Sequence, residues 1–394
     1  KSWLETPFLR HRMLLTKDAQ IEKLKACGVQ YVEIDTDKGL GGGRADEGTP
    51  SAARPEPNGQ ADRRPPIAVP AEPAPLARVP FEEELEVARK VYFDAKNIVE
   101  SAMREVRMGR EINTEAAARV VDGMVDSVLR NVDALASLSR LKSFDEYTFF
   151  HSVNTAVLAL GLGRSLEMDR KTLHSLGMGV LLHDIGKTKI PIDLLNKPAR
   201  YTPDEFEMVK QHALRGAEIL TATDGLLEEA VWPALQHHER MDGTGYPYGR
   251  KESELTLFGR LSSVVDIYDA VTSDRVYHKA MTPHAALQML YDLGQKGHLD
   301  PPLVERFIHC IGIYPVGSCV LLDTGETGIV SQIYQERPLT PKLLLVRDAN
   351  AKPIAHPLPI DLLDGAEAKK RTIAKVLDPA ALGIKTAEYL AVGA

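Results

Sequence analysis

The length, composition and charge of the chain exclude several classes of protein. Its 394 residues are enough for two or three domains, and a hydrophobic fraction of 44% with 26% charged residues is ordinary for a soluble globular protein. The formal net charge of −7 and the pI near 6.0 argue against a polymeric nucleic acid held by a broad basic face, while a small nucleotide stays compatible. No apolar run approaches the roughly 18 residues that a membrane span needs, so none is expected.

The three cysteines, Cys27, Cys310 and Cys319, show no CxxC spacing. Neither a disulfide framework nor a zinc site built from thiolates is therefore indicated. Cysteine usage of this kind predicts a cytoplasmic protein.

Residues 1–38 predict a small module with both helix and strand. An amphipathic helix is expected around Ile21 and Leu24, and Val29–Ile34 predicts a strand. The module is too small for a large core of its own, so we expect it to dock on another domain as a regulatory or a purely structural part. Residues 39–80, rich in glycine and proline, predict a disordered linker.

A helical domain is expected over residues 81–314. Its first helix begins near Phe81, and its apolar residues recur in a heptad seam at Leu85, Ala88, Tyr92, Ala95, Val99, Ala102 and Val106. Thr114 is expected to cap a second helix, whose seam is Val121, Val125, Val128, Val132 and Leu135. Two such helices fit an antiparallel pair within a bundle. The same seam leaves a dimeric coiled coil, and hence a homodimer, as the alternative.

Further helices follow with clear boundary residues. Residues 148–166 are apolar nearly all round, which predicts a central buried helix with His151 in its first turn. Asp169 is expected to cap a helix running to about Ile185, ended by a left-handed Gly186. The capping box Thr202-Pro203-Asp204-Glu205 predicts the start of a helix that carries His212.

The remaining elements complete this domain and add a second kind of structure. A helical stretch after Trp232 ends at His237 and His238, Asp266 lies on a helix over residues 259–272, and another helix runs from Thr282-Pro283 to about residue 293. Past Pro315 the pattern predicts strands at residues 318–322, 328–333 and 342–347. Residues 315–394 are therefore expected to form a small β appendage and a tail.

A series of histidines and carboxylates is the strongest chemical signal. A single histidine is usually an ordinary core or surface residue, and this interpretation is given to His174, His278, His284, His298, His309 and His356. The ordered set is different, because it offers nitrogen and oxygen ligands without any cysteine, as Fe, Mn, Ni or Zn prefer. Its members recur at intervals of about one helix plus a loop, which predicts helices converging on one metal centre: His151, His183, Asp184, His212, His237, His238 and Asp266.

These motifs resemble a known family. His183-Asp184, with His151 upstream and Asp266 downstream, is similar to the pattern of the HD phosphohydrolase superfamily, and the stretch from His237 to Pro247 resembles the signature of its HD-GYP subgroup. Residues 266–270 and 300–317 are also similar to that subgroup, so the resemblance covers about residues 140–335. Residues 3–39 resemble a domain of undefined role often found before HD-GYP domains. The implied fold is mainly α: an HD-type helical bundle with a small N-terminal α/β module and a small C-terminal β appendage.

The resemblance implies a phosphodiesterase that cleaves cyclic di-GMP, a bacterial second messenger, to linear pGpG and possibly on to GMP. It implies that His151, His183, Asp184 and Asp266 hold one divalent metal, and that Asp184 bridges to a second metal held by His212, His237 and His238. Fe or Mn is expected, with Ni, Mg or Zn as alternatives. Some members hold a third metal partly through a Glu one turn before the first histidine. Tyr147 stands there in this chain, with Asp145 and Glu146 out of register, so two metals are predicted.

General chemistry supports a phosphodiesterase with two metal ions. Two cations about 3.5–4 Å apart can share a hydroxide, lower its pKa and clamp a phosphate for in-line attack. Lys187 is expected near the departing 3′ oxygen or a non-bridging oxygen, the alternative being a solvated lysine after a helix end. Arg275 and Lys279 resemble the family's phosphate-contacting positions, although His278 stands where the family often has Lys or Arg. Tyr246 lies in loop 242–247, which could contact substrate or a diguanylate cyclase domain, or could serve loop shape alone.

Three other functions remain open from the sequence. The chain could be a cyclic di-GMP sensor that binds nucleotide with little turnover. It could be a general nucleotide phosphohydrolase of the wider HD superfamily, which the loop at residues 242–247 argues against. It could also act chiefly as a platform for protein interactions.

Overall fold

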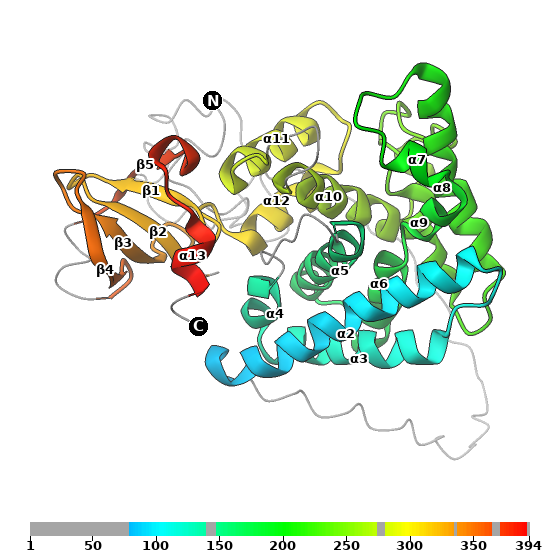
Figure 1. Ribbon diagram of the computed structural model, residues 1–394, viewed down its shortest axis with the longest axis horizontal. Helices are drawn as coiled ribbons and strands as arrows, with labels where there is room; N and C mark the ends of the chain where they lie inside the picture. Colours follow the sequence, from blue (N-terminus) through cyan, green and yellow to red (C-terminus); the bar gives the residue numbers. More distant parts are fainter. Residues whose placement is uncertain (1–78, 139–146, 274–279, 335–336, 365–370, 392–394) are drawn as a thin grey trace, which may run out of the picture. The chain divides into compact units, whose positions relative to one another are not determined.

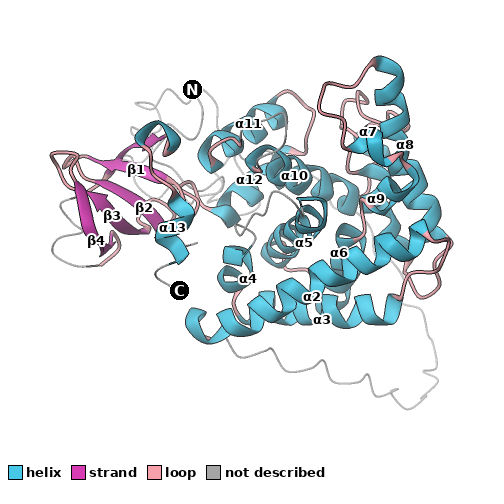
Figure 2. Ribbon diagram, in the orientation of Figure 1, coloured by secondary structure: helices cyan, strands magenta, loops and turns pink. Residues whose placement is uncertain are grey.

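The computed structural model describes residues 79–138, 147–273, 280–334, 337–364 and 371–391. The predicted N-terminal module, the linker up to residue 78, and both Arg275 and Lys279 lie outside these residues. The described part is mainly helical with a small antiparallel sheet near its C-terminal end, which confirms the predicted fold class (Figures 1 and 2). None of its helices combines the length and the apolar character needed to cross a membrane.

The first helical layer is formed by α2 (Phe81–Arg107), α3 (Thr114–Arg130) and α4 (Val132–Leu138). The predicted seam of α2 is buried from Leu85 to Val106, and α2 packs against α3, α4 and α5 (Tyr147–Ser165). The seam is therefore used within the chain, as expected for a bundle. Glu84 on α2 is 1% exposed and accepts hydrogen bonds from Nε and Nη2 of Arg130 at 2.6 and 2.9 Å, which ties the start of α2 to the end of α3.

Two details of this layer differ from the prediction. The cap of α3 is Asn113, whose side chain accepts a hydrogen bond from the backbone N–H of Ala116 at 2.9 Å, and Thr114 is the first helical residue. The helix expected to continue to Leu135 is interrupted at Asn131, whose backbone is extended. The side chain of Asn131 accepts from the N–H groups of Asp133 and Ala134, so it starts a new helix.

Helix α5 is the centre of the bundle. It contacts α2, α3, α4, α6 (Arg170–Leu181), α10 (Leu257–Thr272) and α12 (Pro301–Ile311), and Figure 1 shows it enclosed by these helices. Its residues are buried on every side from Phe150 to Leu160, as the apolar pattern predicts. Asp169 caps α6 by accepting a hydrogen bond from the N–H of Thr172 at 2.7 Å, which confirms that prediction.

The expected role of Gly186 is wrong. Helix α6 ends at Leu181, and Gly186 lies inside a 3-10 turn over Ile185–Lys189 without a left-handed backbone. A side chain is excluded there for another reason: a Cβ atom would lie 1.9 Å from the carbonyl oxygen of His212. Glycine therefore lets this turn pack directly on the backbone of α8 (Pro203–Thr221), and that contact brings His183 and Asp184 next to His212.

Three further helices lie in the described part of the helical domain. They are α7 (Ile192–Leu195), α9 (Trp232–Gln236) and α11 (Pro283–Gln295). The capping box of Thr202 and Glu205 at the start of α8 is present as predicted, and Thr282 caps α11. Helix α12 was not predicted as a helix, although Asp300 caps it and a proline occupies its first position.

The C-terminal sheet has strand order β4-β3-β2-β1-β5, with antiparallel neighbours throughout. Strands β1 (Cys319–Leu322), β2 (Thr327–Gln332) and β3 (Lys342–Arg347) agree with the predicted ones. Strands β4 (Pro353–Asp361) and β5 (Ile373–Leu377) were missed, because prolines in β4 and a mixed pattern in β5 hide them. One face of the sheet packs around Val320 and Leu343, and α13 (Thr386–Ala391) covers part of the other.

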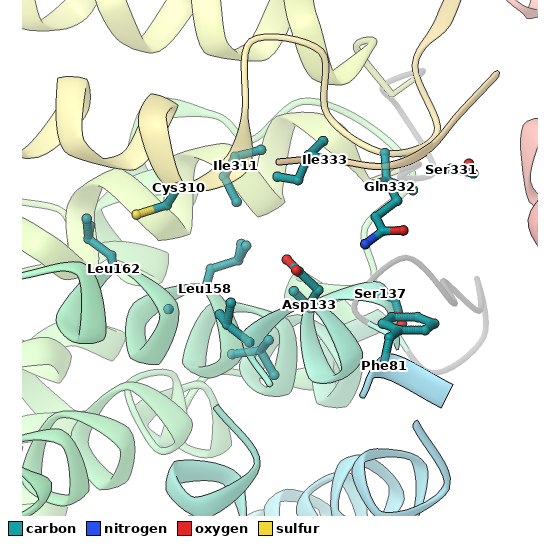
Figure 3. Close-up of a pocket in the computed structure, with 15 residues that line it drawn as sticks. Phe81, Asp133, Ser137, Leu158, Leu162, Cys310, Ile311, Ser331, Gln332 and Ile333 are labelled. Carbon is teal, nitrogen blue, oxygen red and sulfur yellow. The ribbon is translucent and has the colours of Figure 1, made fainter. Parts of the chain in front are cut away.

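A pocket of about 70 Å³ lies where α4, α5 and α12 meet the end of β2 (Figure 3). Leu158, Ile311 and Ile333 form much of its apolar lining, together with the polar side chains of Asp133 and Gln332. The lining contains none of the predicted metal ligands. The predicted metal ligands therefore lie outside this pocket.

Candidate metal centre

All of the predicted metal ligands converge within the helical bundle. His151 comes from α5, His212 from α8 and Asp266 from α10, while the remaining ligands follow helix ends: His183 and Asp184 after α6, and His237 and His238 after α9. Three groups of ligand atoms lie within 4.8 Å of one another: His151 with His183 and Asp266, His212 with His237 and His238, and His183 with Asp184 and His237. Residues spread over 116 positions of sequence thus form one cluster.

Asp184 stands between two sets of imidazoles. Its Oδ2 lies 3.5 Å from Nε2 of His183 and 3.8 Å from Nε2 of His151. Its Oδ1 lies 3.5 Å from Nε2 of His212 and 3.9 Å from Nε2 of His237. The two oxygens of one carboxylate therefore face different histidine groups, which is the arrangement that a bridging ligand needs.

Asp266 completes the group around His151. Its Oδ1 lies 3.0 Å from Nε2 of His151 and 3.8 Å from Nε2 of His183. Its Oδ2 lies 4.0 Å from Nδ1 of His238, on the side of the second group. This carboxylate faces both groups, as Asp184 does.

Three of the histidines are oriented by backbone carbonyls close to them in sequence. Nδ1 of His183 donates to the carbonyl of Val180 at 2.7 Å, and Nδ1 of His212 donates to that of Val209 at 2.7 Å. Nδ1 of His237 donates to the carbonyl of Pro233 at 2.8 Å. Because Nδ1 carries the proton in each case, Nε2 is left with a lone pair that faces the centre, the form in which imidazole binds a metal.

Two buried atoms test whether a cation fits here. Nε2 of His183 and Oδ1 of Asp184 are buried and have no hydrogen-bond partner among the described residues. Leaving such atoms without a partner costs on the order of 1–3 kcal/mol each. Both an imidazole nitrogen and a carboxylate oxygen are good ligands for a divalent cation. The residues present therefore fit a divalent metal site.

The electrostatics keep Asp184, His212, His237 and His238 in their metal-binding forms. Burial would raise the pKa of Asp184, but the Lys187 ammonium and the neighbouring imidazoles outweigh it and hold that pKa well below its usual range. Burial lowers the pKa of His212 and of His238, and it lowers the pKa of His237 to about 3. At neutral pH these carboxylate and imidazole groups are therefore ionised and neutral respectively, as metal binding requires.

Asp269 belongs to the site but was not proposed from the sequence. Its Oδ2 lies 2.7 Å from Nδ1 of His151, and it is 2% exposed. A carboxylate behind a metal-binding histidine fixes the ring and strengthens the ligand. The spacing Asp266-x-x-Asp269 on one helix was the available signal, since residues three apart share a face.

The predicted catalytic lysine lies beside the centre. Nζ of Lys187 is 2.5 Å from Oδ2 of Asp184, and its side chain is 26% exposed. It is thus paired with a ligand and also reaches the surface. Tyr147, the position expected to lack the third-metal glutamate, begins α5, while residues 145 and 146 lie outside the described part of the chain.

The loop with Tyr246 packs directly on the ligands. Gly245 allows this, because a Cβ atom there would lie 2.4 Å from the backbone nitrogen of Arg240. The Tyr246 ring lies 4.6 Å from the His238 ring between centroids. Buried Glu239 accepts hydrogen bonds from the N–H groups of Tyr248 and Arg250 at 2.8 and 3.0 Å, which fixes the far side of the loop.

An aromatic wall continues outward from Tyr246. The Phe206 ring lies 6.1 Å from the Tyr246 ring at an interplanar angle of 83°, and Phe206 is 44% exposed. Nζ of Lys210 lies 5.4 Å from the centroid of Phe206 and 5.8 Å from that of Tyr246. His238, under Tyr246, has a side chain 22% exposed, whereas that of His212 is 2% exposed. The centre therefore reaches the surface next to this wall, a feature the sequence reasoning did not identify.

Comparison with known proteins gives three family matches along the chain. A domain of unknown function matches residues 1–117, an HD domain matches residues 129–303, and a KOW domain associated with the HD domain matches residues 319–385. The first match includes α2, and the second includes every predicted metal ligand.

Proteins similar to this chain include a cyclic di-GMP phosphodiesterase from Pseudomonas aeruginosa, 39% identical over 92% of this chain and 84% of its own length. A 3′3′-cGAMP-specific phosphodiesterase from Vibrio cholerae is 28% identical over 47% of this chain and 42% of its own length. A solved HDG"Y"P protein from Bdellovibrio bacteriovorus covers 56% of this chain and 70% of its own, with 20% identity and a TM-score of 0.48. With the extended match to the Pseudomonas protein, the chain belongs to the HD-GYP family of phosphodiesterases within the HD phosphohydrolase superfamily.

Proposed function

We propose that this chain hydrolyses cyclic di-GMP to linear pGpG at a centre of two divalent metals. The observation that carries the proposal is the position of Asp184, whose two oxygens face separate histidine groups at 3.5–3.9 Å. His151, His183 and Asp266 would hold one cation, and His212, His237 and His238 the other. When bound, two such cations supply a water of lowered pKa and positive charge for the phosphate.

The protein's own groups would orient the substrate around that centre. Lys187, partly exposed beside Asp184, carries a positive charge suited to a non-bridging or departing oxygen of the phosphodiester. Arg275 and Lys279 are proposed as further phosphate contacts on the strength of the family pattern alone. The buried side chains behind the ligands keep their geometry fixed while the substrate binds.

The aromatic wall is proposed as the place where a guanine base binds. A base has a flat π surface, and stacking on an aromatic side chain contributes about 1–3 kcal/mol per base. Tyr246 lies between the His238 ring and exposed Phe206, with Lys210 next to both rings. A base stacked there would hold the attached phosphate close to the metal ligands.

Turnover of purified protein tests this function. Protein purified without oxygen is mixed with Mn²⁺ or Fe²⁺ and cyclic di-GMP, and pGpG and GMP are followed separately. Formation of pGpG, with about two metals per chain, is the expected result, and Fe or Mn is the metal proposed. Nucleotide that binds without conversion would favour a sensor, and cleavage of nucleoside monophosphates would favour a general phosphohydrolase. The same assay with 3′3′-cGAMP decides selectivity among cyclic dinucleotides.

The loop offers a second, separate role as a contact for diguanylate cyclase domains. Tyr248, the residue that follows loop 242–247, is 56% exposed and lies outside the ligand cluster. If the loop binds such a domain, Tyr248→Ala should weaken co-purification and leave turnover intact. Equal co-purification by the unaltered chain and the variant would count against this role.

The cytoplasmic location expected from the cysteines also stays a prediction.

A further inference from the structure

A buried chain of hydrogen bonds links α2 to the metal ligand His151. The hydroxyl of Tyr92 on α2 donates to Oδ1 of Asn154 at 2.6 Å. Nδ2 of Asn154 donates to Oδ1 of Asp269 at 3.2 Å, and Oδ2 of Asp269 lies 2.7 Å from Nδ1 of His151. All of these residues are at most 2% exposed.

The direction of each bond is fixed by chemistry. Asp269 as a carboxylate can only accept, so His151 donates from Nδ1 and presents Nε2 to the centre. Asn154 must then donate its amide to Asp269, which leaves its carbonyl oxygen as the acceptor for the Tyr92 hydroxyl. Burial raises the pKa of Tyr92, and the charge of Asp269 raises it further, so the phenol stays protonated and available as a donor.

Tyr92, the first residue in this series of hydrogen bonds, comes from outside the HD domain match. Tyr92 lies on α2, within the region matched by the domain of unknown function, and 37 residues before the start of the HD domain match. Its ring stacks on Phe150 of α5, with centroids 5.9 Å apart, so the hydroxyl is held in place by apolar packing as well. The HD domain match alone does not contain the complete support for His151.

We propose that Tyr92 is a positioning residue for the metal centre, acting on His151 through Asn154 and Asp269. The inference rests on the metal centre proposed above. Without the Tyr92 hydroxyl, the Asn154 amide loses one of its two hydrogen bonds, its hold on the Asp269 carboxylate weakens, and the His151 ring is held less well. Helix α2, which lies in the region matched by the domain of unknown function, thus contributes to the support of the centre.

The variant Tyr92→Phe tests this with little disturbance, because the ring and its stacking on Phe150 are kept. Mn²⁺ affinity measured by calorimetry should fall about 5-fold, in line with the loss of one supporting hydrogen bond. Asn154→Leu removes both bonds with a side chain of the same branched shape and should lower the affinity about 10–100-fold. The KM for cyclic di-GMP at saturating metal should change less than the metal affinity.

A matched control separates positioning from general loosening. Tyr334, two residues after β2, donates its hydroxyl to Oδ2 of Asp361 at 2.5 Å, so Tyr334→Phe deletes a tyrosine hydrogen bond far from the ligands in sequence. It should leave Mn²⁺ affinity unchanged. The double variant Tyr92→Phe/Asn154→Leu should bind Mn²⁺ as Asn154→Leu does, since Tyr92 acts through Asn154.

The outcomes distinguish the two proposals. If the unaltered chain binds no Mn²⁺, the metal centre itself is wrong. If it binds Mn²⁺ and Tyr92→Phe binds equally well, only the positioning role fails. Additive losses in the double variant would also overturn it, because they would show that Tyr92 acts by another route.

Discussion

The two halves of the metal centre are supported in different ways. His183, His212 and His237 donate Nδ1 to carbonyls three or four residues earlier on the chain, so local backbone geometry orients them. His151 instead faces Asp269, which is 118 residues away, and that carboxylate depends on further side chains. Local backbone geometry therefore orients His212 and His237 in one half and His183 in the other, whereas His151 depends on the packing of distant elements. Substitutions far from the ligands should affect the His151 half most.

The largest effect is expected where the two halves join. Asp184→Asn keeps the shape but removes the charge that both histidine groups face, so turnover should fall about 100–1,000-fold and metal content should drop. Metal analysis and the pGpG assay measure both. Asp193→Asn, an exposed aspartate on α7, is the control and should behave like the unaltered chain. Full metal content in Asp184→Asn would show that the halves do not share this ligand.

The next variant separates the halves directly. Asp269→Asn removes the charged support of His151 and should weaken metal binding about 10–100-fold. Val209→Ala, by contrast, keeps the carbonyl that orients His212 and should leave metal affinity unchanged. Mn²⁺ titration of both variants checks the contrast. A similar loss in the two would mean that local and distant support do not differ.

Base stacking is expected to have a smaller effect, outside both halves. Phe206→Ala should raise the KM for cyclic di-GMP about 10-fold with little change in metal content, because a base would lose part of its stacking surface. Met208 is 48% exposed on the same helix, and Met208→Ala is the matched control. Steady-state kinetics of both variants measure this. An unchanged KM in Phe206→Ala would remove the wall from the substrate site.

The smallest effect concerns pH, because the histidines of the two halves differ in pKa. Burial would lower the pKa of His151, but hydrogen bonds with Asp266 and Asp269 raise it to about 9. This pKa exceeds the value of about 6.5 for a histidine in the unfolded chain. Protonation of His151 therefore stabilises the folded, metal-free protein below about pH 6.5, and this stabilisation is lost as the pH rises through about 9. Metal binding must displace that proton, whereas the pKa of His237, about 3, leaves that imidazole neutral already.

Proton release on Mn²⁺ addition measures this difference. In weak buffer near pH 8, about one proton per chain should be released from His151. Asp269→Asn at saturating Mn²⁺ should release fewer protons, because one of the two carboxylates that raise the pKa is gone. Equal release by both proteins would contradict the assignment of the proton to His151.

Much of this molecule is predictable from sequence because its signals are local. Apolar spacing predicted the buried seam of α2, capping residues such as Thr202 and Asp169 located helix starts, and alternation gave the first three strands. The ligand motif predicted which residues would gather, because histidines and carboxylates in that order have few other uses. The missed strand β4 contains prolines, and its pairing with β3 is specified by its neighbours in the sheet.

By itself, the sequence determined the helical class and predicted a set of metal ligands and the chemistry that they would support. Only the tertiary structure decided that Gly186 is required for close helix packing, that Asp269 supports His151, and that Tyr92 reaches them from α2. The physical reason is that contacts between residues 62 to 118 positions apart leave no periodic trace in a chain. They arise when packed helices bring buried polar groups together, and each such group must then find a partner.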